Sequence, residues 1–253
     1  MFTNRLGEIN RNTFGTEMKI IAYRGSSDVD VMFLDSHGYI YQHALYANFK
    51  NGYIKNPFDP IFFNKGYLGD GKYKCQINNN MQHSYTIWNS MLARCYGNRI
   101  TSYTNSSWVC SDWFNYQNFA KWYEENEYPV KGRLHMDKDI LYPGNKIYSP
   151  YHCLLVPQRI NMLFTNKMNK SGLPNGITKY KDGYVAKYNG EEIGKAKTIK
   201  EAYCLYANRK KEIIIKIANE YKNIIPDRVY QALLSYEVRL ENDKNYNYIK
   251  EAS

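Results

Sequence analysis

This chain of 253 residues lacks a paired-cysteine pattern, and this absence argues against two common kinds of site. The five cysteines are odd in number, and no two of them form a Cys-x-x-Cys pair. We therefore expect neither a disulfide framework nor a structural zinc site. Reduced thiols are typical of proteins that stay in a cytoplasm, which is the compartment that we predict.

Long apolar runs are missing as well. Residues 1–8 lack the basic and then apolar pattern of a signal peptide, and no apolar run approaches the length of a membrane span. The sequence therefore predicts a protein that has no membrane partner.

Acidic residues are too few to balance the basic ones. The chain has 34 Lys and Arg against 24 Asp and Glu, which gives a formal charge of +10. Residues 1–72 carry 8 basic and 7 acidic groups, whereas residues 166–253 carry 17 and 11. A basic excess favours a polyanionic partner, because Lys and Arg release the counterions of a phosphate backbone. A solvated surface without an acidic partner is the alternative.

Turn signals divide the chain into three parts, and the pattern in each predicts a modular α+β fold. Residues 1–72 form a β-rich module with strands over 18–23, 28–33 and 38–41. Residues 73–165 contain two amphipathic helices within 83–126, followed by a strand–strand–helix pattern. Residues 166–253 begin with linker-like composition and continue as three strands and two helices, over 176–180, 183–188 and 191–196 and from Thr198 and Pro226.

Residues 133–161 carry the most specific pattern. A strand that ends in Asp137 is followed by a Gly144-Asn145 turn, a short apolar strand and a helix that contains Asn161. This order is typical of a ββα metal finger, in which a divalent ion is held against a phosphate. Asp137 and Asn161 are therefore the candidate ligands for Mg²⁺, while Asn145 is more consistent with a turn former than with a ligand.

The residue expected to act as the general base of this finger is missing from its usual position. Lys138 follows Asp137, where such fingers carry a histidine, and lysine is protonated at neutral pH unless burial lowers its pKa. His135 shares a strand face with Asp137, and His152 follows the Ser-Pro turn. Both histidines are candidate catalytic bases, and His135 is a candidate ligand as well.

The segments Leu134–Leu141, Gly144–Pro150 and Val156–Phe164 resemble a group of phage and prophage proteins. These are described as HNH-endonuclease-like, with an appended DNA-binding domain of the plant ethylene-response-factor (APETALA-two) type. The segments Trp88–Tyr96, Val109–Trp113 and Phe119–Tyr123 resemble that group too. The resemblance implies a phage or mobile-element origin, a bacterial host cytoplasm and a role on nucleic acid. It leaves activity open, because the histidine of the HNH name is missing beside Asp137.

Residues 172–221 resemble the plant-type domain, in which a three-stranded sheet enters the major groove and a helix packs behind it. Strand alternation places Lys187 and Asn189 on the outer face, with Thr178, Tyr180 and Lys195 as their neighbours. We take these five as candidate DNA contacts, because lysine contacts guanine edges or phosphates and asparagine contacts adenine. The arginines usual on this face are absent, and a module that contacts only protein is the alternative.

Two functional hypotheses follow. The first is a phage-encoded DNA-binding protein with a degenerate HNH nuclease-like centre, which in its active form is a Mg²⁺-dependent DNA nickase or endonuclease. The second is a counter-defence or regulatory protein that binds a host defence protein, or a nucleotide signal, without catalysis. A DNA-binding regulator without catalysis is a variant of the first, and it predicts binding that depends steeply on salt and needs no metal.

Overall fold

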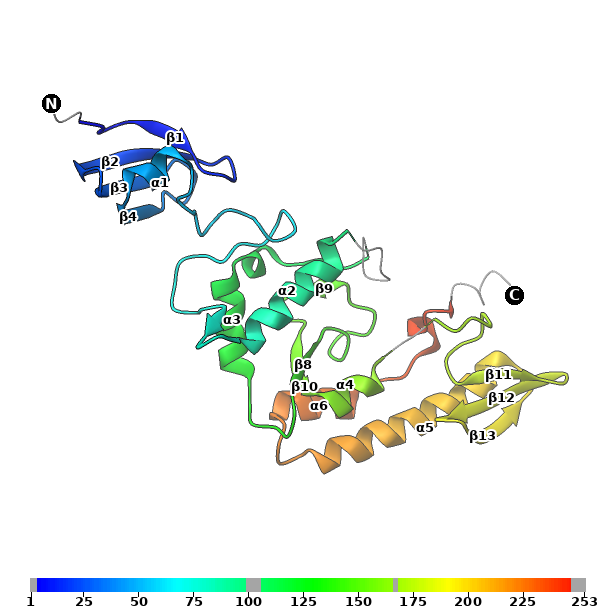
Figure 1. Ribbon diagram of the computed structural model, residues 1–253. Helices are drawn as coiled ribbons and strands as arrows, with labels where there is room; N and C mark the ends of the chain where they lie inside the picture. The colour runs from blue at the N-terminus through cyan, green and yellow to red at the C-terminus, as the bar shows by residue number, and fades with distance from the viewer. Residues whose placement is uncertain (1–3, 99–105, 166–167, 247–253) are drawn as a thin grey trace. The chain divides into compact units, whose positions relative to one another are not determined.

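The computed structural model describes residues 4–98, 106–165 and 168–246 of an α+β protein (Figure 1). The chain forms two compact units, Met1–Glu125 and Asn126–Ser253, here called unit 1 and unit 2. The two helices of the predicted middle domain belong to unit 1, and the strand–strand–helix pattern belongs to unit 2. The division at residues 72 and 165 stays a prediction.

Unit 1 begins with an antiparallel sheet in the order β1-β2-β3-β4, followed by the short helix α1. Alternation along β3 buries Val29, Val31 and Phe33 on one face, as the sequence predicts for a half-buried strand. On the other face of the sheet, a row of directly paired residues runs across the four strands from Ile9 through Lys19 and Met32 to Ile40. The bounds are β1 Ile9–Arg11, β2 Glu17–Gly25, β3 Asp28–Phe33, β4 Ile40–Ala44 and α1 Tyr46–Lys50.

The rest of unit 1 is built around an aromatic core. The indole Nε1 of the fully buried Trp88 on α2 donates a hydrogen bond to the carbonyl of Trp113 at 2.7 Å. The ring centroid of Trp113 lies 5.0 Å from that of Phe119 on α3. The apolar stripes of the two predicted helices are therefore core. The elements are β5 Gln76–Ile77, β6 Asn80–Met81, α2 His83–Tyr96, β7 Trp108–Val109, a 3-10 helix Ser111–Phe114 and α3 Tyr116–Asn126.

Unit 2 contains a small hairpin with a helix and a separate three-stranded sheet. The strands β8 and β10 pair in antiparallel fashion and α4 follows directly, and β11, β12 and β13 pair in chain order. The elements are β8 Leu134–Asp137, β9 Ile147–Tyr148, β10 Leu154–Pro157, α4 Gln158–Leu163, β11 Ile177–Tyr180, β12 Gly183–Tyr188, β13 Glu191–Ala196, α5 Ile199–Glu220, α6 Asp227–Ser235 and a 3-10 helix Leu240–Asn242.

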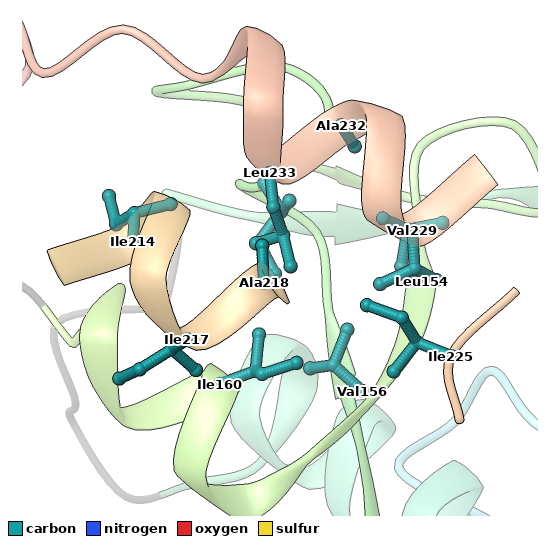
Figure 2. Packing of buried hydrophobic residues seen from close by; sticks show 11 residues of the cluster. Leu154, Val156, Ile160, Ile214, Ile217, Ala218, Ile225, Val229, Ala232 and Leu233 are labelled. Carbon is teal, nitrogen blue, oxygen red and sulfur yellow. The ribbon is translucent and has the colours of Figure 1, made fainter. Parts of the chain in front are cut away.

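The long helix α5 packs on both parts of unit 2. It begins at the predicted capping box, in which Glu201 N donates to Thr198 Oγ1 at 3.2 Å and Thr198 N donates to Glu201 Oε2 at 3.1 Å. Its first half packs Ala202, Tyr203 and Tyr206 against Ile177 and Ala186 of the sheet. Its second half joins the core shown in Figure 2, where residues of β10, α4, α5, α6 and the turn between the last two helices meet: Leu154, Val156, Ile160, Ile214, Ile217, Ala218, Ile225, Val229, Ala232 and Leu233.

A close approach explains the glycine at the start of β11. Gly176 has a φ of +78°, and a Cβ at this position would lie 2.2 Å from the ring of Tyr206 on α5. Only glycine adopts this conformation without strain and also leaves room for the tyrosine ring. A glycine at this position therefore allows the sheet to pack closely against α5.

The segment before β11 has linker-like composition, yet part of it is tied down. The buried Asn245 donates from Nδ2 to the carbonyls of Asn169 at 2.7 Å and Leu173 at 3.0 Å. The carboxylate of Asp243 accepts from the backbone N–H of Asn175 at 3.0 Å. The C-terminal segment thus holds residues 169–175 in place. Among the helices that the structure describes, none combines the length and the apolarity needed to cross a membrane.

Candidate functional site

The strands β8 and β10 with α4, together with the connection Lys138–Cys153, are called the finger below. In its register Asp137 lies opposite Leu154, and His135 lies opposite Val156. Directly opposed residues of an antiparallel pair point to the same face of the sheet. His135 and Asp137 therefore share the face on which Leu154 and Val156 pack against α4, α5 and α6 (Figure 2).

Asp137 is half-buried, and its carboxylate accepts hydrogen bonds from the backbone that follows it. Its Oδ1 accepts hydrogen bonds from the backbone N–H of Asp139 at 2.7 Å and of Ile140 at 2.9 Å. Burial, with a smaller effect from the charge of Asp139, raises the pKa of Asp137 to about 6, and the two hydrogen bonds oppose this shift. Burial and these two carboxylates also raise the pKa of Tyr236, which follows α6, to about 12.

Lys138, at the position of the expected base, is a donor in this structure. Its buried ammonium donates to Asp139 Oδ1 at 2.8 Å, to Asp139 Oδ2 at 3.0 Å and to the carbonyl of Asn145. An ammonium that donates to three acceptors has no lone pair with which to take a proton from water. The geometry gives this side chain a role in holding the connection.

Asn145 is the turn former that the sequence indicates. Its Nδ2 donates to the carbonyls of Lys138 at 2.9 Å and Ile147 at 2.7 Å, and its Oδ1 accepts from Ile147 N at 3.1 Å. One side chain thus ties the end of β8 to the start of β9. The side chains of Lys138 and Asn145 together hold the segment between β8 and β9 in a closed turn.

The other predicted site residues of the finger are spread around it. His152 Nδ1 lies 2.7 Å from Ser149 Oγ, and its ring centroid lies 5.1 Å from that of Tyr142. Asn161 is half-buried on α4, next to the fully buried Ile160. In the described part of the chain, no trio of His, Cys, Asp or Glu ligand atoms gathers at Asp137.

The finger offers a poor fit to a hydrated Mg²⁺. Magnesium takes octahedral oxygen ligands and usually keeps several waters. Asp137 supplies one carboxylate whose Oδ1 already accepts two backbone N–H groups, and it lies on the face that packs against helices. We derive no hydrolytic step from this arrangement.

A different trio of ligand types lies in unit 1. One ligand atom from each of Asp28, Asp30 and His43 falls within 4.8 Å of the other two. Arg24 already occupies both carboxylates, with Nε 2.7 Å from Asp28 Oδ2 and Nη1 3.0 Å from Asp30 Oδ2. Its hydrogen bond lowers the pKa of Asp28 to about 2. A metal ion would compete with this guanidinium. The sequence did not indicate the trio, because strand pairing brings His43 to the two aspartates.

The outer face of the β11–β13 sheet collects four of the five predicted DNA contacts. Thr178 lies opposite Val185, and Val185 lies opposite Lys195, so these residues form one row across the sheet. Tyr180 and Lys187 belong to the same face by alternation. Ile177 and Ala186 point the other way, toward α5. We call the set Thr178, Tyr180, Lys187 and Lys195 the sheet face.

Tyr180 is the centre of a basic and aromatic group on the sheet face. Its side chain is 45% exposed, and its ring centroid lies 4.7 Å from Lys195 Nζ and 5.4 Å from Lys181 Nζ. Glu192 Oε1 lies 3.5 Å from Lys195 Nζ and offsets part of this charge. The face thus presents an aromatic ring with cations beside it, a combination found where proteins contact nucleic acid.

Asn189, the fifth predicted contact, lies at the tip of the β12–β13 hairpin. Its φ is +50° and that of Gly190 is +87°, which are the conformations of a tight hairpin turn. Its side chain is exposed and lies outside the strands. The position serves the turn, and a contact with DNA at this tip stays a prediction.

The net charge of unit 2 favours an anionic partner, but its cavity does not. Residues 126–253 carry 22 basic and 14 acidic groups, so this unit holds most of the +10 charge of the chain. A cavity of about 430 Å³ in this unit is lined by one basic and two acidic side chains. Arg239 donates a hydrogen bond to Glu237, and Glu241 is the second acid. This lining suits a phosphate poorly. The residues around it are Ile140, Leu141, Pro143, Ala232, Ser235, Tyr236, Glu237, Arg239, Glu241 and Asn242.

No protein-family model, curated protein or solved structure matches this chain. The resemblance to HNH-like phage proteins therefore stays a prediction. The function is inferred below from the residues and contacts of the chain itself.

Proposed function

We propose that the chain binds DNA through the sheet face of unit 2, and that the finger stabilises this unit without cutting the bound strand. The observation that supports this best is Tyr180, an exposed ring with two lysine ammonium groups within 5.4 Å of its centroid. Lysine contacts phosphate or a guanine edge, and tyrosine adds an apolar face beside it.

The finger supports the second half of the proposal. Its carboxylate caps a turn, and the lysine at the base position donates to three acceptors. Its hydrophobic face joins β10 and α4 to α5 and α6, and α5 also carries the sheet. The finger thus fixes the helix on which the sheet face is built, and this function needs no metal.

Removing two charges from the sheet face is expected to weaken DNA binding. The double substitution Lys187→Gln and Lys195→Gln should raise the Kd for a fluorescein-labelled duplex by about tenfold or more, because each lysine contacts phosphate or a base edge. Fluorescence anisotropy measures this. The matched control, Lys200→Gln with Lys216→Gln, removes two exposed charges from α5 and should change the Kd by less than about threefold. Equal losses in both double variants would contradict binding at the sheet face.

The finger is expected to leave DNA intact. Supercoiled plasmid incubated with the whole chain and Mg²⁺ or Mn²⁺ should yield no more nicked circles than plasmid incubated with the Asp137→Ala variant. Gel electrophoresis of the plasmid forms measures this. Nicking by the native chain that Asp137→Ala abolishes would overturn the structural role of the finger and establish a nickase.

A second function, contact with a host defence protein, is favoured by one feature of unit 1. A row of cross-strand neighbours on the open face of its sheet runs through Ile9, Lys19, Met32 and Ile40, of which Ile9 and Ile40 are 57% and 43% exposed. Exposed apolar residues that lie on one face of a sheet are typical of a protein contact. This function would be shown by a native chain that binds no DNA but captures one host protein, if substitution of Ile40 abolishes that capture.

A further inference from the structure

The connection between β8 and β10 exposes aromatic rings that the sheet face does not use. Tyr151 is 78% exposed and Tyr142 is 55% exposed. The ring of His152 lies against Tyr142, with centroids 5.1 Å apart, and Tyr151 is its neighbour along the chain. Three rings thus lie on one connection at the surface of unit 2.

The backbone that carries Tyr151 and His152 is held by hydrogen bonds. The carbonyl of Ser149 accepts hydrogen bonds from the backbone N–H of His152 at 3.2 Å and of Cys153 at 3.0 Å. Ser149 and Cys153 are both buried, and Ser149 Oγ also bonds to His152 Nδ1 at 2.7 Å. Arg228 at the start of α6 donates from Nη2 to the carbonyl of Tyr151 at 3.0 Å. Tyr151 is therefore presented to solvent on a fixed turn, which lowers the entropy that a ligand must remove.

The charge beside the rings favours an anion. The connection contributes the exposed Lys146, and Arg228 brings a guanidinium to the backbone of Tyr151. The one carboxylate of the connection, Asp139, is paired with Lys138 at 2.8 Å. Asp227, beside Arg228, accepts from the neutral side chain of Gln231 at 3.1 Å and keeps its negative charge. The two cations, Lys146 on the connection and Arg228 on α6, therefore outnumber the carboxylate of Asp227.

We propose that Tyr151, with Tyr142 and His152, forms a stacking surface for the unpaired bases of single-stranded DNA. A base offers its π-face to a protein ring only when it is unpaired, and every base has such a face. Nearby cations then contact the phosphates of the same strand. This inference rests on the proposed function and adds a substrate class to it: DNA with an unpaired stretch, held on the finger while the sheet face holds the backbone or a duplex.

The test compares a 20-nucleotide single strand with the corresponding duplex, using fluorescence anisotropy and the whole chain. The Tyr151→Ala variant should weaken single-strand binding by about 5- to 100-fold, the usual effect of losing one stacked ring, and should leave duplex binding within about twofold. Tyr151→Trp should restore single-strand binding. The control Tyr53→Ala removes a ring of unit 1 that is 63% exposed and should change neither affinity. Circular dichroism of each variant checks that the fold is kept.

Different failures have different meanings. A Tyr151→Ala variant that binds the single strand like the native chain overturns the stacking surface alone, provided that the duplex is still bound. Equal losses for single strand and duplex also overturn it, because they indicate a backbone contact and no stacking. A native chain that binds neither form overturns the proposed function and this inference together.

Discussion

The Asp137→Asn variant is expected to be more stable than the native chain at pH 8, by up to about 3 kcal/mol in unit 2. The pKa of this carboxyl group rises from 3.8 to about 6 in the folded protein, mainly because burial disfavours the charged form. Each unit of pKa shift corresponds to about 1.4 kcal/mol. Asparagine keeps an oxygen that can accept from the N–H groups of Asp139 and Ile140, and it carries no charge.

The sign of the pH dependence follows from the same shift. A folded pKa above the unfolded one means that the folded state binds the proton more tightly. The contribution of Asp137 to the free energy of unfolding is therefore fully present below pH 4, falls as the pH rises to about 6, and stays low above that. The native chain and the Asp137→Asn variant should have similar stability at pH 4 and should diverge toward pH 8.

The tryptophans allow the two units to be followed separately. All four lie in unit 1, at positions 88, 108, 113 and 122, so their fluorescence reports the unfolding of that unit. Hydrogen exchange of peptides from Leu134–Leu163 reports unit 2. At pH 8 exchange there should be slower in Asp137→Asn, while the control Asp182→Asn, at an exposed hairpin turn, should match the native chain. Faster or unchanged exchange in Asp137→Asn would contradict the cost assigned to this carboxylate.

The Asn145→Ala variant is expected to lose about 2–4 kcal/mol of stability in unit 2, the opposite of the Asp137 result. Its side chain makes three hydrogen bonds, to the carbonyls of Lys138 and Ile147 and to the N–H of Ile147. Alanine would leave these backbone groups without their partner and would loosen the carbonyl that Lys138 contacts.

Hydrogen exchange also measures this second effect. Peptides covering Lys138–Cys153 should lose protection in Asn145→Ala. The control Asn223→Ala removes an exposed asparagine of the turn after α5 and should leave exchange unchanged. Native-like exchange in Asn145→Ala would show that this side chain does not hold the connection.

Much of the fold is predictable because it depends on local patterns. Alternation predicts β3, the Asn189-Gly190 turn predicts the β12–β13 hairpin, and the Thr198–Glu201 capping box predicts the start of α5. The strands β1, β5, β6, β7 and β9 were not predicted. They span only two or three residues, which is too short to show a period.

The candidate site is less predictable because it depends on packing between distant residues. The sequence correctly places His135 and Asp137 on one strand face, since successive side chains alternate. It does not show that α5 and α6 cover this face, because those helices follow many residues later and are brought there by the core around Ile160 and Leu233. One of the three acceptors of Lys138, the carbonyl of Asn145, lies seven residues away and is reached only in the folded connection. The exposure of Tyr151 has no local signature either.

The salt dependence of DNA binding tests the central claim most directly. The affinity of the whole chain for a duplex should fall by at least about tenfold between 50 and 200 mM salt, as two or more phosphate contacts require. The double variant Lys187→Gln and Lys195→Gln should show a shallower slope, and the α5 control should keep the native slope. A chain that binds no DNA at 50 mM salt, or a slope that the sheet-face substitutions leave unchanged, would contradict the account.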